Sequence, residues 1–316
     1  MNLLITGGCG FIGSNFINYY FTKYPNTFII CLDAMYYCAS INNIHSHILE
    51  STRFKYINGN INDYDLLVSI FKQYNITHIV HFAAQSYVDN SFTNSLQYTE
   101  DNVKGTHTIL ESIKNTNRDI FLLHFSTDEV YGESQLDSNM MKTESSILAP
   151  TNPYAASKAA AEMYVLSYIC SFKLKALITR GNNVYGINQY PEKLIPRFIK
   201  LLRNNMKCTI HGLGDMVRNF IHVDDVCMAV DILLERGVVG EIYNIGSDIT
   251  NEFSVIDIAN ILIEKICHTT EYNKYIEYIE DRPFNDKRYF ISNDKLVNLG
   301  WKQTINFNDG INHLLN

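Results

Sequence analysis

The sequence lacks an excess of positive charge, and this absence limits what the protein can bind. Its 26 Lys and Arg residues are outnumbered by 33 Asp and Glu residues, and the formal net charge is -7. A nucleic-acid-binding surface normally carries a basic patch. We therefore expect no nucleic-acid partner, and an anionic ligand would need its own local group of lysines and arginines.

Paired cysteine motifs and long apolar runs are also absent. None of the seven scattered cysteines forms a CxxC pair, which argues against a zinc site or a disulfide framework and favours reduced thiols in the cytoplasm. No apolar run approaches the roughly 20 residues of a membrane-spanning helix. The first residues show no basic stretch followed by an apolar one. We expect no metal, no membrane partner and no signal peptide.

What the sequence does contain is a regular alternation of strand-like and helix-like segments. Its 316 residues, 46% of them hydrophobic, suffice for about two domains with buried cores. Apolar runs predict strands at 2–6, 28–33, 54–58, 78–83, 121–126 and 176–180. Helical patterns lie between them at 14–23, 65–74, 103–115 and 154–171. This order predicts an α/β fold with a doubly wound parallel sheet of the Rossmann type.

The alternation fades after residue 180, which predicts a change of domain. We expect residues 1–180 to form a dinucleotide-binding domain and residues 181–316 a smaller substrate-binding domain. The helical pattern at 226–236 indicates that part of 215–240 returns to the first domain.

A glycine-rich turn follows the first predicted strand. Its glycines have the spacing GxxGxxG, at Gly7, Gly10 and Gly13, and Phe11 and Ile12 lie between the last two. Glycines at such a turn let the backbone approach a pyrophosphate, and the next helix offers free N–H groups to the phosphates. The spacing alone also fits an ordinary strand-to-helix turn, so its context has to decide.

Asp33 supplies that context and favours NAD as the cofactor. It ends the second predicted strand, about 20 residues after the glycine turn. A carboxylate there accepts hydrogen bonds from the ribose 2′-hydroxyl of NAD and repels the additional phosphate of NADP. After the third and fourth strands, Asn60 and Ile61 are expected near the adenine, and Ala83 and Ala84 beneath the cofactor.

Tyr154 and Lys158 are four residues apart on a predicted helix, and this spacing puts them on one face. A lysine ammonium within about 6 Å can lower the pKa of a tyrosine, ordinarily about 10, by roughly 1–3 units. Tyr154 would then be a base for a sugar hydroxyl. In isolation this pair is more often a surface pair, but the glycine turn and the hydroxyls of Ser126 and Thr127 favour a catalytic role.

Together these motifs resemble the extended short-chain dehydrogenases/reductases, and within them the nucleotide-sugar 4,6-dehydratases. The resemblance covers nearly the whole chain and rests on 7–14, HFAAQSYVDNS (81–91), STDEVYG (126–132), PTNPYAASKA (150–159), RGNNVYGINQYPEKLIP (180–196) and DRPFNDKRYF (281–290). The last two segments and the Tyr37-Cys38 dipeptide are most similar to the UDP-glucose 4,6-dehydratase domain of plant rhamnose synthases. The sequence printed here ends without the reductase half of those proteins, so we expect a separate enzyme to complete the pathway.

The resemblance implies roles for three residues after the fifth strand. Thr127 is expected to hold the C4 oxygen of the hexose, Asp128 to act as the acid and Glu129 as the base that removes the C5 proton. Two adjacent carboxyls push each other's pKa values apart, which suits one acid and one base. Because neighbours on a regular strand point to opposite faces, the strand must end before both can reach one sugar.

The remaining substrate contacts must neutralise a diphosphate. Arginine forks suit phosphate oxygens, which favours Arg218 and Arg282, and Lys193 is expected near the same pocket. The resemblance adds Asn183 and the segment 193–198 to this pocket, and Ser86 at the sugar end. It also implies a homodimer formed through the helices at 103–115 and 154–171.

The activity implied is a lyase reaction on UDP-glucose, as a step of rhamnose biosynthesis. The same reaction on dTDP-glucose is the first alternative, because uracil and thymine differ by one methyl group. A 4-epimerase would not need the acid pair at 128 and 129. A non-catalytic NAD-binding scaffold is a further alternative, but it would have no use for Tyr154 and Lys158 together with these two acids.

Overall fold

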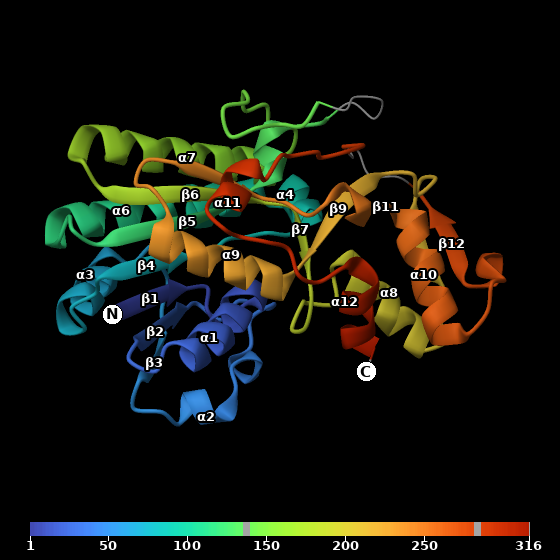
Figure 1. Ribbon diagram of the computed structural model, residues 1–316, viewed down its shortest axis with the longest axis horizontal. Coiled ribbons are helices and arrows are strands. Elements are labelled where there is room, and N and C mark those ends of the chain that lie inside the picture. Colours follow the sequence, from blue (N-terminus) through green and yellow to red (C-terminus); the bar gives the residue numbers. More distant parts are fainter. Residues whose placement is uncertain (135–139, 281–285, 316) are drawn as a thin grey trace.

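A seven-stranded parallel sheet forms the centre of the computed structural model, which describes residues 1–134, 140–280 and 286–315 (Figure 1). The strand order is β10-β6-β5-β4-β1-β2-β3. These strands are β1 (Asn2–Thr6), β2 (Phe28–Asp33), β3 (Phe54–Asn58), β4 (His78–His81), β5 (Phe121–Thr127), β6 (Lys175–Gly181) and β10 (Ile242–Ile245). The chain winds outward in both directions from β1, so the predicted doubly wound fold is confirmed.

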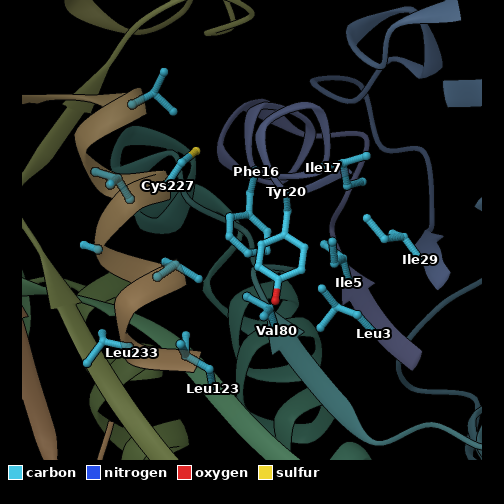
Figure 2. Packing of buried hydrophobic residues seen from close by; sticks show 14 of the residues in the cluster. Leu3, Ile5, Phe16, Ile17, Tyr20, Ile29, Val80, Leu123, Cys227 and Leu233 are labelled. Atoms are coloured by element: carbon cyan, nitrogen blue, oxygen red, sulfur yellow. The ribbon is translucent and has the colours of Figure 1, made fainter. Parts of the chain in front are cut away.

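Helices cover both faces of this sheet. α1 (Phe11–Lys23) and α9 (Val223–Arg236) pack on one face. α3 (Tyr64–Gln73), α6 (Gly105–Thr116) and α7 (Pro153–Phe172) pack on the other. Figure 2 shows the first face, where Phe16 and Tyr20 of α1 lie over Val80 of β4. Burial on both sides explains why the strands are almost continuously apolar in sequence.

A helix and a strand that follow residue 215 return to this sheet: the helix packs on it and the strand pairs within it. α9 packs against α1, and β10 pairs in parallel with β6 along 242–245. Figure 2 shows Cys227 and Leu233 of α9 among the side chains of the shared core. The sequence predicted a returning helix but not a returning strand.

A third core lies at the other end of the molecule, on the right of Figure 1. Its strands are β7 (Asn183–Tyr185), β9 (Val217–His222) and β11 (Glu252–Ser254) in one sheet, and β8 (Cys208–His211) and β12 (Ile276–Ile279) in another. Its helices are α8 (Leu194–Arg203), α10 (Val255–Cys267) and α12 (Phe307–Leu315). The aromatic side chains of Tyr185, Phe198 and Phe220 fill its interior.

The short elements complete the chain and include one irregular helix. They are α2 (Ser46–Leu49), α4 (Val88–Thr93), α5 (Ser95–Tyr98), α11 (Asp294–Asn298), and single 3₁₀ turns at 41–43, 128–131, 249–251 and 272–274. A π-helical turn, Thr99–Lys104, precedes α6, so the helix predicted from residue 103 begins earlier. Within this turn the Asn102 amide bonds to the backbone of Gln85 and to Ser157 Oγ. In the described residues, no helix has the length and apolar character needed to cross a membrane.

Candidate active site

Among the described residues, all the predicted site residues except Arg218 line one cleft at the carboxyl ends of the parallel strands, where doubly wound sheets bind ligands. The expected cofactor residues that line it are Gly7, Gly10, Phe11, Ile12, Gly13, Asp33, Asn60, Ile61, Ala83 and Ala84. The expected catalytic residues that line it are Thr127, Asp128, Glu129, Tyr154 and Lys158. Ser86, Asn183 and Lys193 line the same cleft.

The glycine turn is packed too tightly for a side chain at Gly7 or at Gly13. Gly7 has φ +70°, and a Cβ there would lie 2.7 Å from the backbone of Ala83. A Cβ on Gly13 would lie 2.3 Å from the carbonyl oxygen of Gly7. The turn therefore brings its backbone and the start of α1 to the floor of the cleft, an arrangement that fits a pyrophosphate.

Asp33 is held beside this turn. Its two carboxylate oxygens accept hydrogen bonds from the backbone N–H groups of Cys9 (2.9 Å) and Met35 (2.8 Å). Burial raises its pKa, and these backbone bonds act in the opposite direction. Each oxygen keeps lone pairs for a ribose hydroxyl. The residues present therefore fit the adenosine end of NAD.

The amide at Asn60 is engaged with protein groups. Its Nδ2 donates to Tyr36 Oη at 3.2 Å, and its Oδ1 accepts from the backbone of Asn62 at 2.8 Å. Tyr36, which the sequence analysis missed, also lines the cleft and donates to Asp101. A tyrosine after a strand carries no signal of its own, so only the fold could reveal this contact.

Tyr154 and Lys158 lie on α7, as the four-residue spacing predicted. Asn152 caps this helix and Pro153 occupies its first turn, which fixes where the helix begins. Both side chains are buried, and Lys158 Nζ donates to the carbonyl oxygen of Phe125 at 2.7 Å. Burial lowers the pKa of Lys158 to about 8. The helix thus presents a phenol and a titratable amine to the same cleft.

The pKa of Tyr154 is raised, and not lowered as the four-residue spacing predicted. Burial raises the pKa of Tyr154 above its ordinary value, and the negative charge of Glu129 raises it further. The Thr127 hydroxyl acts in the opposite direction. Burial dominates because the phenolate would lose its hydration.

The acid pair begins where β5 ends. A 3₁₀ turn, Asp128–Tyr131, follows the strand at once, and Thr127 Oγ1 accepts from the backbone of Glu129 at 3.3 Å. The alternation of strand side chains therefore stops before the pair, and both Asp128 and Glu129 line the cleft. The strand thus ends before the acid pair, which is the condition for both carboxyls to reach one sugar.

Both carboxyls hold protons more tightly than usual. Burial raises the pKa of Asp128 to about 7, and the charge of Glu129 contributes to this shift. Burial also raises the pKa of Glu129, while a hydrogen bond from Asn152 and the charges of Arg218 and Lys193 lower it. A buried carboxyl with a pKa near neutrality is suited to proton transfer.

Two asparagines that the sequence analysis missed hold this pair. Asn182 Nδ2 donates to Asp128 Oδ2 at 2.7 Å, and Asn152 Nδ2 donates to Glu129 Oε2 at 3.0 Å. Asn152 had a visible signal, because Asn before Pro is a frequent start of a helix. Asn182 follows β6, whose carboxyl end lies beside that of β5, so the strand order could have indicated it.

Lys193 connects the two sides of the cleft. It lies at the start of α8, and its Nζ donates to the carbonyl oxygen of Ser86 at 2.7 Å. The ammonium also lies 5.4 Å from the centre of the Tyr87 ring. Burial lowers the pKa of Lys193, although nearby acids oppose this effect.

Of the two arginines predicted to bind the diphosphate, the structure describes one. Arg218, on β9, is not among the described residues that line the cleft; its guanidinium lies 4.8 Å from the centre of the Tyr289 ring. Its charge nevertheless lowers the pKa of both Asp128 and Glu129. Arg282 lies outside the described residues.

The fold and cleft together define a class of enzyme. A glycine cradle, a carboxylate at the end of β2 and a Tyr–Lys pair on α7 are the parts of an NAD-dependent extended short-chain dehydrogenase/reductase. The chain belongs to the family described as GDP-mannose 4,6 dehydratase, whose model matches residues 4–314, and so to the NAD-dependent nucleotide-sugar 4,6-dehydratases.

Individual relatives agree with this assignment. The chain is 45% identical to a dTDP-D-glucose 4,6-dehydratase of Dictyostelium discoideum, over 98% of this chain and 79% of that protein. It is 44% identical to a trifunctional UDP-glucose 4,6-dehydratase, epimerase and reductase of Arabidopsis thaliana, over 98% of this chain but only 46% of that protein. A dTDP-glucose 4,6-dehydratase of Streptomyces venezuelae, solved with NAD, is 35% identical, with a TM-score of 0.92 over 98% of this chain and 94% of that one.

Proposed function

We propose that the chain is a UDP-glucose 4,6-dehydratase that forms UDP-4-keto-6-deoxyglucose. The observation that carries the dehydration is the acid pair, Asp128 and Glu129, which lies in the same cleft as Tyr154 and the glycine cradle. An enzyme that only oxidised and reduced a sugar would need no second pair of titrating groups. Two carboxyls with raised pKa values add the means to remove a proton and a hydroxyl.

The first step is oxidation at C4 of the hexose. Tyr154 takes the proton of the C4 hydroxyl while Thr127 holds the same oxygen, and Lys158 supplies positive charge close to the phenol. Gly7, Gly13 and Asp33 would hold NAD, which when bound accepts the C4 hydride and later returns it to C6. The Thr127 hydroxyl, which acts to lower the raised pKa of Tyr154, supports this proton transfer.

The elimination follows from the ketone at C4. The C5 proton is now α to a carbonyl and acidic enough for a carboxylate to remove, which is the role of Glu129. Asp128, with its pKa raised to about 7, keeps a proton near neutral pH and donates it to the departing C6 hydroxyl. Water is lost across C5 and C6, and C5 is reprotonated when the hydride returns to C6.

Recognition of the nucleoside diphosphate needs local positive charge in an acidic protein. Lys193 enters the cleft from α8, and Arg218 acts on the acid pair from β9. We assign Lys193, Arg218 and Arg282 to the diphosphate, and Asn183 and Ser86 to the remaining polar contacts.

The preference for uracil rests on the similarity of 180–196 and of Tyr37-Cys38 to the plant UDP-glucose enzymes. Cys38 lines the cleft, so this dipeptide lies close enough to a bound ligand to affect its binding. The 45% identity to the Dictyostelium enzyme favours dTDP-glucose as a second candidate. One methyl group is worth about 1–3 kcal/mol in a pocket, so either nucleotide could be turned over at a measurable rate.

The deciding experiment compares UDP-glucose with dTDP-glucose under identical conditions. Product is detected by the alkali-induced absorbance of a 4-keto-6-deoxy sugar. We expect kcat/KM for UDP-glucose to be higher by about ten-fold or more. Faster turnover of dTDP-glucose would assign the chain to the second candidate. Formation of UDP-galactose would indicate a 4-epimerase, and an unchanged sugar would indicate a scaffold.

We also propose that the enzyme is a cytoplasmic homodimer formed through α6 and α7. α7 exposes Met163 and Tyr164, which suits a contact with a second copy. The free state of all seven cysteines is consistent with a reducing compartment. Light scattering of the purified protein would test the dimer, and a Met163→Glu variant should weaken it.

A further inference from the structure

Asn152 takes part in two hydrogen bonds that join two parts of the site. Its Oδ1 accepts from the backbone N–H of Ala155 at 2.8 Å and so caps α7. Its Nδ2 donates to Glu129 Oε2 at 3.0 Å. The residue is buried, with 7% of its surface exposed. One side chain therefore fixes both the start of the helix that carries Tyr154 and the carboxylate that follows β5.

These two parts would otherwise be independent. Glu129 lies on a 3₁₀ turn after β5, whereas Tyr154 lies on a helix more than twenty residues later in the sequence. The elimination requires the base to reach C5 of a sugar whose C4 oxygen is held at Tyr154. Because these carbons are bonded neighbours, a small displacement of α7 relative to Glu129 would misalign one of the two steps.

We propose that Asn152 is a positioning residue, which ties Glu129 to the helix of Tyr154 and favours the ionised, proton-accepting form of this carboxyl. This inference rests on the proposed function, since it assumes that Glu129 is the base. An N–H donor to a carboxylate stabilises the charged state and cannot accept a proton from the neutral one. In agreement, the bond from Asn152 acts against the rise in the pKa of Glu129 that burial causes.

Asn182 provides a matched comparison on the other acid. It donates to Asp128 Oδ2 at 2.7 Å, and it is buried to a similar degree. Its Oδ1 accepts from the backbone of Ser247, so it is attached to a loop and not to α7. The two amides are chemically equal, but only Asn152 connects an acid to the helix of Tyr154.

The test separates the two bonds of Asn152. Asn152→Ser keeps a good helix cap but removes the amide donor, whereas Asn152→Ala removes both. The variants are compared with wild type in the pH profile of turnover, in the accumulation of reduced nicotinamide and in melting temperature. Asn182→Ser is the control, because it removes a like donor from Asp128.

We expect Asn152→Ser to shift the acidic limb of the pH profile upward by about one pH unit or more, because loss of a charge-assisted bond raises the pKa of Glu129. Reduced nicotinamide should accumulate below that limb, while the melting temperature stays near that of wild type. Asn152→Ala should show the same limb and a lower melting temperature. Asn182→Ser should instead move the basic limb upward, because it raises the pKa of Asp128.

An unchanged acidic limb in Asn152→Ser would overturn the proposal and reduce Asn152 to a helix cap. Equal slowing of oxidation and elimination at every pH would overturn it too, because it would indicate general displacement of α7. Failure of the proposed function is distinguishable from both results: the wild-type protein itself would then form no 4-keto-6-deoxy product from either nucleotide sugar.

Discussion

Glu162 within α7 and the acid pair, Asp128 and Glu129, have very different hydrogen-bond partners. Glu162 of α7 is fully buried and pairs with Arg180. The Nη2 and Nε atoms of Arg180 lie 2.6 Å and 3.0 Å from Glu162 Oε2. The guanidinium also lies 4.7 Å from the centre of the Tyr131 ring. Asp128 and Glu129 instead receive neutral amides, with the full charges of Arg218 and Lys193 acting through space.

The difference separates a structural charge from the acid pair that we propose is reactive. Glu162 has a fork of arginine donors that satisfies its carboxylate oxygens. Asp128 has only partial compensation, so burial holds its pKa near 7, at the cost of folding stability. Buried acids of the first kind hold an element in place, whereas those of the second kind are available for chemistry.

The sharpest test of this division is kinetic. Tyr154→Phe should slow the initial oxidation by roughly 10²–10⁴-fold, because it removes the group assigned to take the C4 proton. Glu129→Gln and Asp128→Asn should still oxidise C4 but stall before water leaves. Stopped-flow absorbance of the nicotinamide would then rise and persist in the two acid variants alone. Equal loss of oxidation in all three would contradict the assigned roles.

The second test removes one partner of the structural pair. Glu162→Gln should lower the free energy of unfolding by about 3–5 kcal/mol, because it leaves the buried Arg180 without a counter-ion. Urea unfolding measures this loss. Asp119→Asn is the control: its pair with Lys175, at 2.8 Å, is exposed, and we expect no measurable change. A similar effect of both changes would remove the distinction between buried and exposed pairs.

The smallest expected effect has the opposite sign. The raised pKa of Asp128 means that its contribution to stability is fully present below about pH 4 and is lost as the pH rises through about 7. Asparagine does not ionise, so Asp128→Asn should be more stable than wild type at pH 8, by roughly 1–3 kcal/mol. Unfolding free energies at pH 4 and pH 8 measure this. A stability difference that does not grow with pH would argue against a buried, strained carboxyl.

Local patterns allowed much of the fold and site to be predicted. The glycine turn, Asp33 and the Tyr154–Lys158 spacing are each contained in one strand–turn–helix or helix segment, and local chemistry determines them. β10 could not be predicted in the same way, because its pairing with β6 depends on residues far apart in sequence. Burial is likewise a property of the folded whole, which is why the expected acidity of Tyr154 was wrong.

The hydrogen bonds from two asparagines to the acid pair were not predicted from local sequence either. Asn152 and Asn182 are ordinary residues in the sequence, and each meets its acid only because β5, β6 and α7 converge. Asn183, by contrast, was predicted through a resemblance, whereas its neighbour Asn182, which donates to Asp128, was overlooked. Motifs therefore pointed to the proposed reacting groups more readily than to the amides that donate to them.

The late entry of β10 into the central sheet has a consequence for how the chain is made. On the ribosome, residues 1–181 can emerge and their strands can begin to pair. The outer edge of β6 remains unpaired until β10, which ends at residue 245, has also been synthesised. Until then an open strand edge and the uncovered side of α1 are available to other nascent chains. Synthesis of the intervening segment sets the length of that vulnerable interval, and a gene cut between the two halves would make it permanent.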